Sequence, residues 1–366
     1  MRKAIMSFVI VTFSLGTIVM AGCSDRATSL QRYERDNIVM DTLVHIEVYA
    51  PEPHKGKQAL DAAFAELVRI GDLSDRFAGK NLADPEVSDV FRINSNAGVK
   101  PVKVSDDTLA MLNKSLHYAG LSNGAFDPTV GPLMELWGFG QQYCQVPGSE
   151  ELKASLALVG FQRLVIDSKA KTVFLPVKGM KVDLGGIAKG YATDRAVEKL
   201  REMGIHSAII NAGGNVYALG SRPNGTPWTI GIRDPRDRTR IIAVIKAKDA
   251  AVATSGDYER YFIKDGVRYH HILDPSTGKP ARHLMAVTVV AANAAQADVL
   301  ATALFVLGPQ SGPVMMRSLS GAKAVFVDKQ KNVIITPGLK DKLELVEGGG
   351  YRFILEAGEH WGELSG

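Results

Sequence analysis

The stretch VDLGGIAKGYATD (residues 182–194) places an acid, two adjacent glycines and a base within one short segment. Asp183 stands just before Gly185 and Gly186, and Lys189 stands just after them. Glycines let a strand turn tightly into a helix, and a helix N-terminus offers free backbone amides that attract anions. The segment matches neither common nucleotide-binding glycine motif. Two interpretations therefore stay open: a phosphate-binding turn assisted by Lys189, or a turn whose glycines serve packing alone.

A second candidate site lies in AQADVLATALFVLG, where Asp298 and Thr302 are four residues apart. On a helix they share one face, about a turn apart. A carboxylate and a hydroxyl are hard oxygen ligands that suit Mg²⁺, which takes few protein groups and leaves its other positions to water and phosphate. The alternative is a carboxylate that favours the helix dipole and a threonine that bonds back to a carbonyl.

A third candidate is the segment YHHILDPSTGKP. His270 and His271 are adjacent on an expected strand, so they point to opposite faces and at most one faces a site. His271 is a candidate general base, because imidazole titrates near neutral pH, or a structural histidine. Asp274 belongs to a DPSTG turn, where proline and glycine set the backbone.

The segment SNGAFDPTVGPLMELWGFG is a stiff loop that carries an aromatic ring and an acid. Pro128 and Pro132 flank Asp127, Phe126 offers an aromatic face, and Gly124 allows close approach. Such a loop can hold a flat ring with a polar tail, or it can be a packed surface loop without a ligand. The chain has no CxxC, HExxH or GxSxG motif, which disfavours a zinc enzyme or a serine hydrolase.

Helices and short strands must position these groups. Residues 44–50 (VHIEVYA) alternate as a half-buried strand, and residues 57–70 carry an apolar helical face that includes Val68. Ser105 is typical of a helix N-cap, and an alanine-rich helix is expected over about 294–307.

Short strand patterns dominate the rest of the chain, and they do not alternate regularly with helices. The expected strands are SAIINA, VYALG, WTIGI, IIAVIKA, YERYFI, VRYHHIL and MAVTVVAA, with a hairpin in RLVIDSKAKTVFLP and two or three closing strands. The predicted fold class is therefore α+β, with mixed, largely antiparallel sheets and flanking helices.

The N-terminus reads as an export signal. Residues 1–22 begin with two basic residues and continue as an apolar run that ends in small residues, a pattern of a cleaved signal peptide. The sequence VMAGC resembles a bacterial lipobox, which predicts lipidation of Cys23; ordinary cleavage with a free thiol is the alternative. Residues 23–36 are polar and predict a lipidated tether, and residues 37–366 predict one domain, in one body or in two lobes around one site.

Charge and cysteine content exclude other classes. Removing the signal lowers the 43 basic side chains to 41, against 39 acidic ones, so no nucleic-acid partner is expected. The basic cluster RDPRDRTR is interleaved with acids, as in a solvated loop. Once Cys23 is lipidated, Cys144 alone remains, so no internal disulfide is expected and stability must come from the core.

Together these segments resemble the ApbE family, the FAD:protein FMN transferases of the bacterial envelope. The resemblance covers about residues 40–308. The motifs that carry it are MDTLVHI, LSDRF, FRIN, GAFDPTVGPL, LWGFG, VDLGGIAKGYATD, NAGGNVYALG, PWTIGIRDP, VATSGDYERYF, HHILDPSTGKP and ADVLATAL. Asp41 stands in MDT where the family usually has glycine.

The resemblance implies an ApbE-like, T-fold-related architecture with FAD as substrate and Mg²⁺ as metal. It places three groups at the metal: the carbonyl of Gly186 and the side chains of Asp298 and Thr302. Asp298 is also expected to be catalytic. It implies these FAD-contacting residues: Met40, Phe77, Ala125, Phe126, Asp127, Asp183, Lys189 and Leu273. His271 is expected nearest the phosphates.

The implied activity is Mg²⁺-dependent transfer of FMN from FAD to a threonine or serine hydroxyl of another envelope protein, with release of AMP. Two alternatives stay open: an FAD pyrophosphatase that uses water as acceptor, and a flavin-binding lipoprotein without turnover. The implied location is the periplasmic face of a bacterial membrane, inner or outer, with a lipid anchor at Cys23. The proton acceptor is left open between His271 and a carboxylate near the metal.

Overall fold

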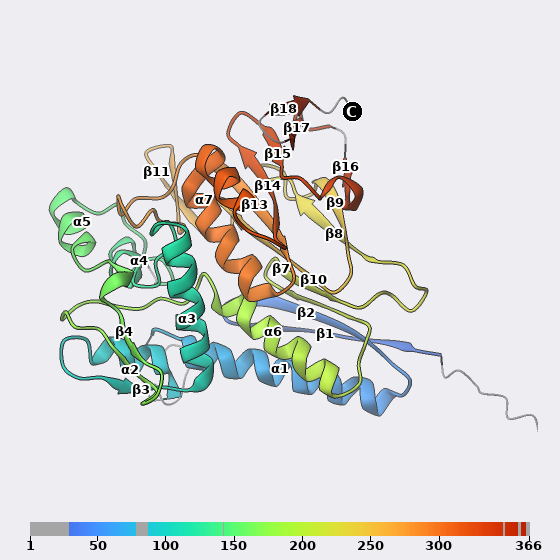
Figure 1. The fold of residues 1–366 in the computed structure, drawn as a ribbon, viewed down its shortest axis with the longest axis horizontal. Helices are drawn as coiled ribbons and strands as arrows, with labels where there is room; N and C mark the ends of the chain where they lie inside the picture. The colour runs from blue at the N-terminus through green and yellow to red at the C-terminus, as the bar shows by residue number, and fades with distance from the viewer. Residues whose placement is uncertain (1–28, 78–86, 142, 347, 358–359, 364–366) are drawn as a thin grey trace, which may run out of the picture.

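One large sheet organises the protein. The computed structural model describes residues 29–77, 87–141, 143–346, 348–357 and 360–363 (Figure 1). In spatial order the strands of the sheet are β1 (Gln31–Val39), β2 (Thr42–Ala50), β6 (Ala208–Ala212), β7 (Asn215–Leu219), β10 (Ala250–Gly256), β13 (Leu284–Ala291), β14 (Lys323–Asp328), β15 (Asn332–Ile335), β17 (Arg352–Ala357) and β18 (His360–Glu363). Neighbouring strands are antiparallel except β15 and β17. The predicted α+β class with largely antiparallel sheets is confirmed.

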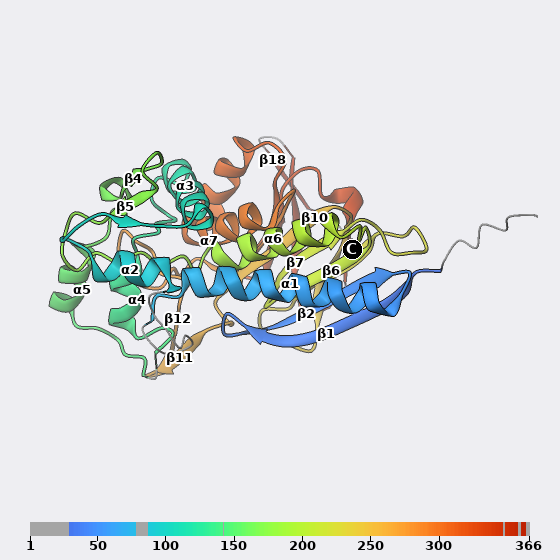
Figure 2. The ribbon, with the colours of Figure 1, turned by 90° about the horizontal axis from the view of Figure 1, so that it is seen from below.

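Three long helices cover one face of this sheet. They are α1 (Pro53–Ser74), α6 (Ala188–Glu202) and α7 (Ala294–Arg317). Figures 1 and 2 show them side by side, with α6 between α1 and α7. Their apolar residues and those of the strands beneath form the largest hydrophobic core, which includes Leu67, Leu200 and Phe305. Burial of these side chains drives the packing.

The other face is covered by a three-stranded sheet. Its strands are, in order, β16 (Leu343–Leu345), β9 (Ile241–Ala247) and β8 (Trp228–Arg233). A second core lies between the two sheets, with Trp228, Ile245 and Val325 buried. Alternate residues of β8 are buried and exposed, as expected for a strand with one solvated face.

The remaining elements gather at one end of the molecule, remote from the start of β1 (Figures 1 and 2). They are α2 (Asp89–Ser95), α3 (Asp106–Leu121), α4 (Gly131–Trp137), α5 (Ser149–Leu156), the sheet of β3 (Val102–Lys103), β5 (Thr172–Phe174) and β4 (Val165–Asp167), and the hairpin of β11 (Tyr261–Lys264) and β12 (Val267–His270). Single-turn 3₁₀ helices lie at Phe161–Arg163 and Lys340–Lys342.

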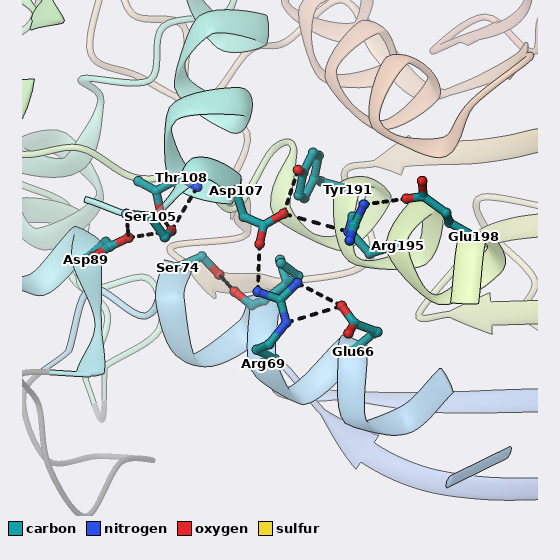
Figure 3. Close-up of polar contacts among 11 residues, drawn as sticks. Glu66, Arg69, Ser74, Asp89, Ser105, Asp107, Thr108, Tyr191, Arg195 and Glu198 are labelled. Carbon is teal, nitrogen blue, oxygen red and sulfur yellow. Dashed lines mark hydrogen bonds and ion pairs between the residues drawn. The ribbon is translucent and has the colours of Figure 1, made fainter. Parts of the chain in front are cut away.

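A polar network joins α1, α3 and α6 (Figure 3). Asp107, in the first turn of α3, accepts hydrogen bonds from Arg69 Nη1 at 2.6 Å and from Tyr191 Oη at 2.8 Å. Arg69 also pairs with Glu66, and Arg195 Nε lies 3.7 Å from Asp107. The cations beside Asp107 keep its pKa below the ordinary value despite burial, and hydrogen bonding to this carboxylate raises the already burial-shifted pKa of Tyr191. The network fixes the start of α6.

Among the described helices, α7 alone is long and apolar enough to cross a membrane. It packs on β10 and β13, and most of it is buried in the core. Gly308, with φ 78°, interrupts the helix, and Pro309 follows. Packing against the sheet thus explains its apolar composition.

Several predicted boundaries need correction. The tether expected over residues 23–36 ends sooner, because residues 31–36 belong to β1 and pair with β2. The helix expected over 57–70 starts at Pro53, which suits a first helical turn, and Val68 is exposed rather than inward. The strand expected in YERYFI begins only at Tyr261. The signal peptide and Cys23 lie outside the described residues.

Candidate active site

A cavity of about 710 Å³ lies where α1, α6, α7, β10 and the β1–β2 turn meet. Its size is typical of a site for a small molecule or cofactor. The structure brings all the candidate site residues except Cys23 to this one cavity: Met40, Phe77, Ala125, Phe126, Asp127, Asp183, Gly186, Lys189, His271, Leu273, Asp298 and Thr302. Six segments that are well separated in the sequence therefore form one site.

The double-glycine turn leads into α6 and needs its glycines. A Cβ on Gly186 would lie 2.8 Å from Cε2 of Phe126 and 3.5 Å from Oγ1 of Thr302. Gly185 donates its N–H to Oδ1 of Asp183 at 2.8 Å. Close packing and an open backbone at the helix start are thus both present, so the two interpretations of this turn do not exclude each other.

Asp183 is held by an arginine that the sequence analysis missed. Nε of Arg76 lies 2.8 Å from Oδ2 of Asp183, and both side chains are almost fully buried. Arg76 also donates from Nη2 to the Phe139 carbonyl at 2.7 Å, and its guanidinium lies 4.1 Å from the ring centre of Phe77. Its Nη1 is buried without a hydrogen-bond partner among the described residues. The carboxylate of Glu135 lies 4.0 Å from this nitrogen and offsets part of its charge.

Asp298 and Thr302 face the cavity from α7. Asp298 is 5% exposed, and its Oδ2 accepts a hydrogen bond from Gly190 N at 2.9 Å. Its Oδ1 lies 3.9 Å from Nζ of Lys189. Thr302 Oγ1 donates back to the Asp298 carbonyl at 3.3 Å and lies 3.4 Å from Oγ of Ser255. The alternative role foreseen for this threonine, bonding within the helix, is therefore real, yet its hydroxyl still lines the cavity.

The donor set around Oδ1 of Asp298 fits a hard cation. A carboxylate oxygen, a threonine hydroxyl and the nearby backbone of Gly186 are oxygen ligands of the kind that Mg²⁺ prefers. The neighbouring ammonium of Lys189, which also donates to the Gly185 carbonyl at 3.2 Å, adds positive charge for an anionic ligand.

The two adjacent histidines point to opposite sides, as predicted. His271 lines the cavity, whereas His270 is buried, donates from Nε2 to the Ala281 carbonyl at 2.6 Å and packs on Phe305. Partial burial in the cavity wall, with the cations Arg260 and Lys189 nearby, lowers the pKa of His271 below its ordinary value. The imidazole is therefore neutral at pH 7.

The tautomer of His271 follows from its neighbour. Its Nδ1 lies 3.3 Å from the Arg260 carbonyl, which can only accept, so the proton sits on Nδ1. Nε2 then carries the free lone pair and is the atom able to take a proton.

The Ala125–Asp127 loop is internally satisfied. Oδ1 of Asp127 accepts hydrogen bonds from the amide and the hydroxyl of Thr129 at 2.7 and 2.6 Å, and Oδ2 accepts from Phe161 N at 2.9 Å. Burial raises the pKa of Asp127. The carboxylate thus shapes the loop, while Phe126 presents its ring to the cavity beside Gly186.

Met40 reaches the cavity through an unusual turn. Met40 and Asp41 have φ of 54° and 56°, so the two-residue β1–β2 turn has the type I′ form, in which glycine is common. The turn survives with aspartate in the second place, because aspartate tolerates this conformation better than most residues. A Cβ on Gly71 would lie 2.9 Å from Met40 Cγ. The glycine in α1 therefore leaves room for the Met40 side chain.

Other cavity residues lie within the quoted motifs VATSGDYERYF and NAGGNVYALG but were not singled out as site residues. Thr254 and Ser255 come from β10, which the sequence analysis did not identify as a strand. Nδ2 of Asn215 is a buried donor at the cavity without a hydrogen-bond partner among the described residues. Arg260 adds a cation to the lining. A pattern search could not single these out, because each is an isolated polar residue in a strand or turn.

Comparison with known proteins shows consistent similarity. The ApbE family model matches residues 40–326. The FAD:protein FMN transferase of Treponema pallidum is 34% identical over 352 residues, which cover 92% of this chain and 94% of the relative. A Vibrio cholerae protein of the same name is 39% identical over 229 residues, 62% of this chain and 68% of the relative.

Solved structures of ApbE proteins are similar to this chain as well. The ApbE protein of Thermotoga maritima has a TM-score of 0.75 and 39% identity, and the alignment covers 82% of this chain and 95% of that one. The flavin transferase ApbE of Vibrio cholerae has a TM-score of 0.76 and 30% identity, with 86% and 99% covered.

Proposed function

Because the chain belongs to the ApbE family, we propose that it transfers FMN from FAD to a threonine or serine hydroxyl of another envelope protein and releases AMP. One observation carries the proposal: Asp298 and Thr302, two hard oxygen ligands, share a cavity wall with Lys189 and the double-glycine turn. This combination suits a metal-bound pyrophosphate.

The pyrophosphate of FAD is expected beside the start of α6. Lys189 and Arg260 supply positive charge there, and the backbone around Gly186 leaves room for phosphate oxygens. The imidazole of His271 is neutral at pH 7, so it adds no charge to this part of the cavity and is free to accept a proton. The flavin ring is expected against the apolar part of the cavity formed by Met40 and Phe126, since aromatic faces and thioethers pack well on flat rings.

Mg²⁺ would be held by Asp298 Oδ1, Thr302 Oγ1 and the Gly186 carbonyl. When bound, the ion supplies neutralisation of the pyrophosphate charge. Gly190 fixes Asp298 by donating to its other oxygen, so one carboxylate both joins α6 to α7 and faces the cavity.

In the transfer step, the acceptor hydroxyl oxygen forms a bond to the FMN-side phosphorus. The bond from that phosphorus to the bridging oxygen breaks, and AMP leaves with the bridging oxygen and its electron pair. His271 Nε2 takes the hydroxyl proton. A nearby dianionic pyrophosphate raises the pKa of an imidazole, so substrate binding makes His271 a better base than it is in the free protein.

The exported location belongs to the same proposal. Residues 1–22 act as a signal peptide, and a lipid on Cys23 anchors the protein at the periplasmic face of a membrane. More than one acyl chain on Cys23 gives stable attachment. FAD and the flavin-accepting envelope proteins are then its partners.

Mass spectrometry tests the proposal. The purified protein is incubated with FAD, Mg²⁺ and candidate exported proteins, and the acceptor should gain the mass of FMN on a threonine or serine while AMP appears in equal amount. AMP without any labelled protein would instead indicate a pyrophosphatase. FAD that stays intact in the presence of Mg²⁺ and acceptor would indicate a flavin-binding protein and overturn the proposal.

A further inference from the structure

Strand β1 is an edge of the large sheet among the described strands. It is nine residues long, it pairs with β2 on one side, and its residues are mostly exposed. A long exposed edge is uncommon without protection, because it presents unpaired N–H and C=O groups to any other chain. Charged side chains such as Glu34 and Asp36 discourage unspecific pairing along most of this edge, whereas its end at Ile38 is apolar and exposed.

The register shows which amides face outward. In a hairpin with a two-residue turn, the pair that flanks the turn, here Val39 and Thr42, is hydrogen-bonded, and pairs alternate from there. The backbone N–H and C=O groups of Ile38, Asp36 and Glu34 therefore point away from β2.

Two contacts support this assignment. Ile38 N donates to its neighbour's side chain, Asn37 Oδ1, at 2.8 Å, not to β2. On the partner strand, the carbonyl of Leu43, which lies opposite Ile38, accepts from Gly213 N at 3.1 Å, away from β1. The amides of Glu34 and Asp36 are thus outward donors on the free edge.

This edge leads directly to the active site. Its last residues, Ile38 and Val39, line the cavity together with the Met40–Asp41 turn. Ile38 is 75% exposed and Leu43, opposite it, is 62% exposed. An exposed apolar pair beside a cavity mouth is typical of a surface that another molecule covers.

We propose that the free edge of β1 binds an extended segment of the acceptor protein by strand addition and so guides its hydroxyl into the cavity. The inference rests on the proposed function, which requires a protein as second substrate. Main-chain hydrogen bonds to the edge supply affinity that does not depend on sequence. Asp36 and Ile38 point to the same face; the Asp36 carboxylate contacts His45 Nδ1 at 2.8 Å, and the exposed Ile38 favours a segment with an apolar residue at the matching position.

Proline substitutions test the contribution of the outward amides of β1. Asp36→Pro and Glu34→Pro each remove one outward N–H, and proline is tolerated on an edge strand when its nitrogen faces away from the partner strand. The controls are Asp36→Ala and Glu34→Ala, which remove the same carboxylates and keep the amides. None of these side chains lines the cavity.

The probe is an acceptor protein that the wild-type chain labels with FMN, purified without flavin. Each proline variant should raise the KM for this acceptor roughly tenfold relative to its alanine control, the effect of about one lost hydrogen bond. The Kd for FAD should stay unchanged, which shows that the variant is folded.

An unchanged KM in both proline variants with unchanged FAD binding would overturn the proposal. So would a KM effect that follows a change from dimer to monomer in sedimentation, since the edge would then join two copies of this chain. If a proline variant loses FAD binding through misfolding, competition decides: a β1-edge peptide, residues 31–39, should inhibit labelling by the wild type, and no inhibition counts against the proposal. Failure of the wild type to label any protein would instead reject the proposed function itself.

Discussion

At the scale of single residues, the two carboxylate oxygens of Asp298 have different roles. Oδ2 accepts the Gly190 amide, and Oδ1 faces the cavity near Lys189. A substitution that keeps the first contact and changes the second can therefore separate structure from chemistry.

Asp298→Asn makes this separation. The asparagine carbonyl can still accept from Gly190, but an NH₂ group replaces the charged oxygen at the cavity. We expect AMP release with Mg²⁺ to fall at least about 100-fold, because several kcal/mol of charge stabilisation is lost. The free energy of unfolding should change by no more than about 1 kcal/mol.

The matched control for this experiment is Thr302→Ser, which keeps the hydroxyl and should keep most of the activity. An Asp298→Asn protein that still releases AMP at the wild-type rate would contradict the assigned role of this carboxylate.

The buried His270 is expected to make the free energy of unfolding depend on pH. Burial lowers its pKa from 6.5 to about 4, and its Nδ1 already accepts from Ile272 N at 3.3 Å, so the folded state has no place for a second proton. Between these values the unfolded chain binds more protons than the folded one, so stability falls as pH falls from 6.5 toward 4. At about 1.4 kcal/mol per unit, the loss approaches roughly 3 kcal/mol.

Urea unfolding of the wild type and of His270→Gln measures this term. The variant cannot titrate, so its stability should decline less between about pH 6.5 and pH 4. Parallel pH profiles for the two proteins would show that His270 does not contribute.

At the scale of elements, the site depends on how closely α6 and α7 approach. A Cβ on Gly190 would lie 2.2 Å from the Ala294 carbonyl oxygen, which is backbone and cannot move aside. Asp194, one turn later on α6, accepts from the amides of Ala294 and Ala295 at 2.6 and 2.9 Å and so caps α7. The two helices that carry Lys189 and Asp298 are thus fixed to each other.

Gly190→Ala should therefore destabilise the protein by about 3 kcal/mol, the cost of overpacking a rigid contact. Gly120→Ala is the matched control, because Gly120 is a helical residue of α3 with nothing within 4 Å of its Cβ position. It should stabilise the protein by about 0.5 to 1 kcal/mol through helix propensity. Denaturant unfolding compares the two, and equal effects would contradict the close-contact argument.

Elements with a regular apolar pattern could be predicted from the sequence, and irregular ones could not. The alternation in β2 and the N-cap at Ser105 were read correctly. Strand β10, AAVATSG, was missed because alanine and glycine favour strands weakly. Strand β1 was read as a tether because an edge strand need not be apolar. Arg76 was missed because its partner Asp183 lies more than 100 positions away in the sequence.

At the scale of the whole molecule, the cavity and Gln31, the first residue of β1, lie at opposite ends of this strand. The strand begins at Gln31, remote from α4 and the β11–β12 hairpin, and ends at the cavity (Figures 1 and 2). At about 3.3 Å per residue, its nine residues span roughly 30 Å. Gln31 therefore lies well away from the cavity.

We therefore expect the lipid anchor proposed at Cys23 to affect the location of the protein and not its chemistry. Cys23→Ser should move the protein from the membrane fraction to the soluble fraction of cells. Its kcat and KM with FAD and a soluble acceptor should match those of the wild type in detergent, because no cavity residue precedes Ile38 among the described residues. Labelling of acceptors held in the membrane should fall, since the anchor raises their effective concentration near the cavity. A Cys23→Ser protein that stays in the membrane fraction would contradict lipidation at this residue, and a lower kcat would show that the N-terminal segment takes part in catalysis.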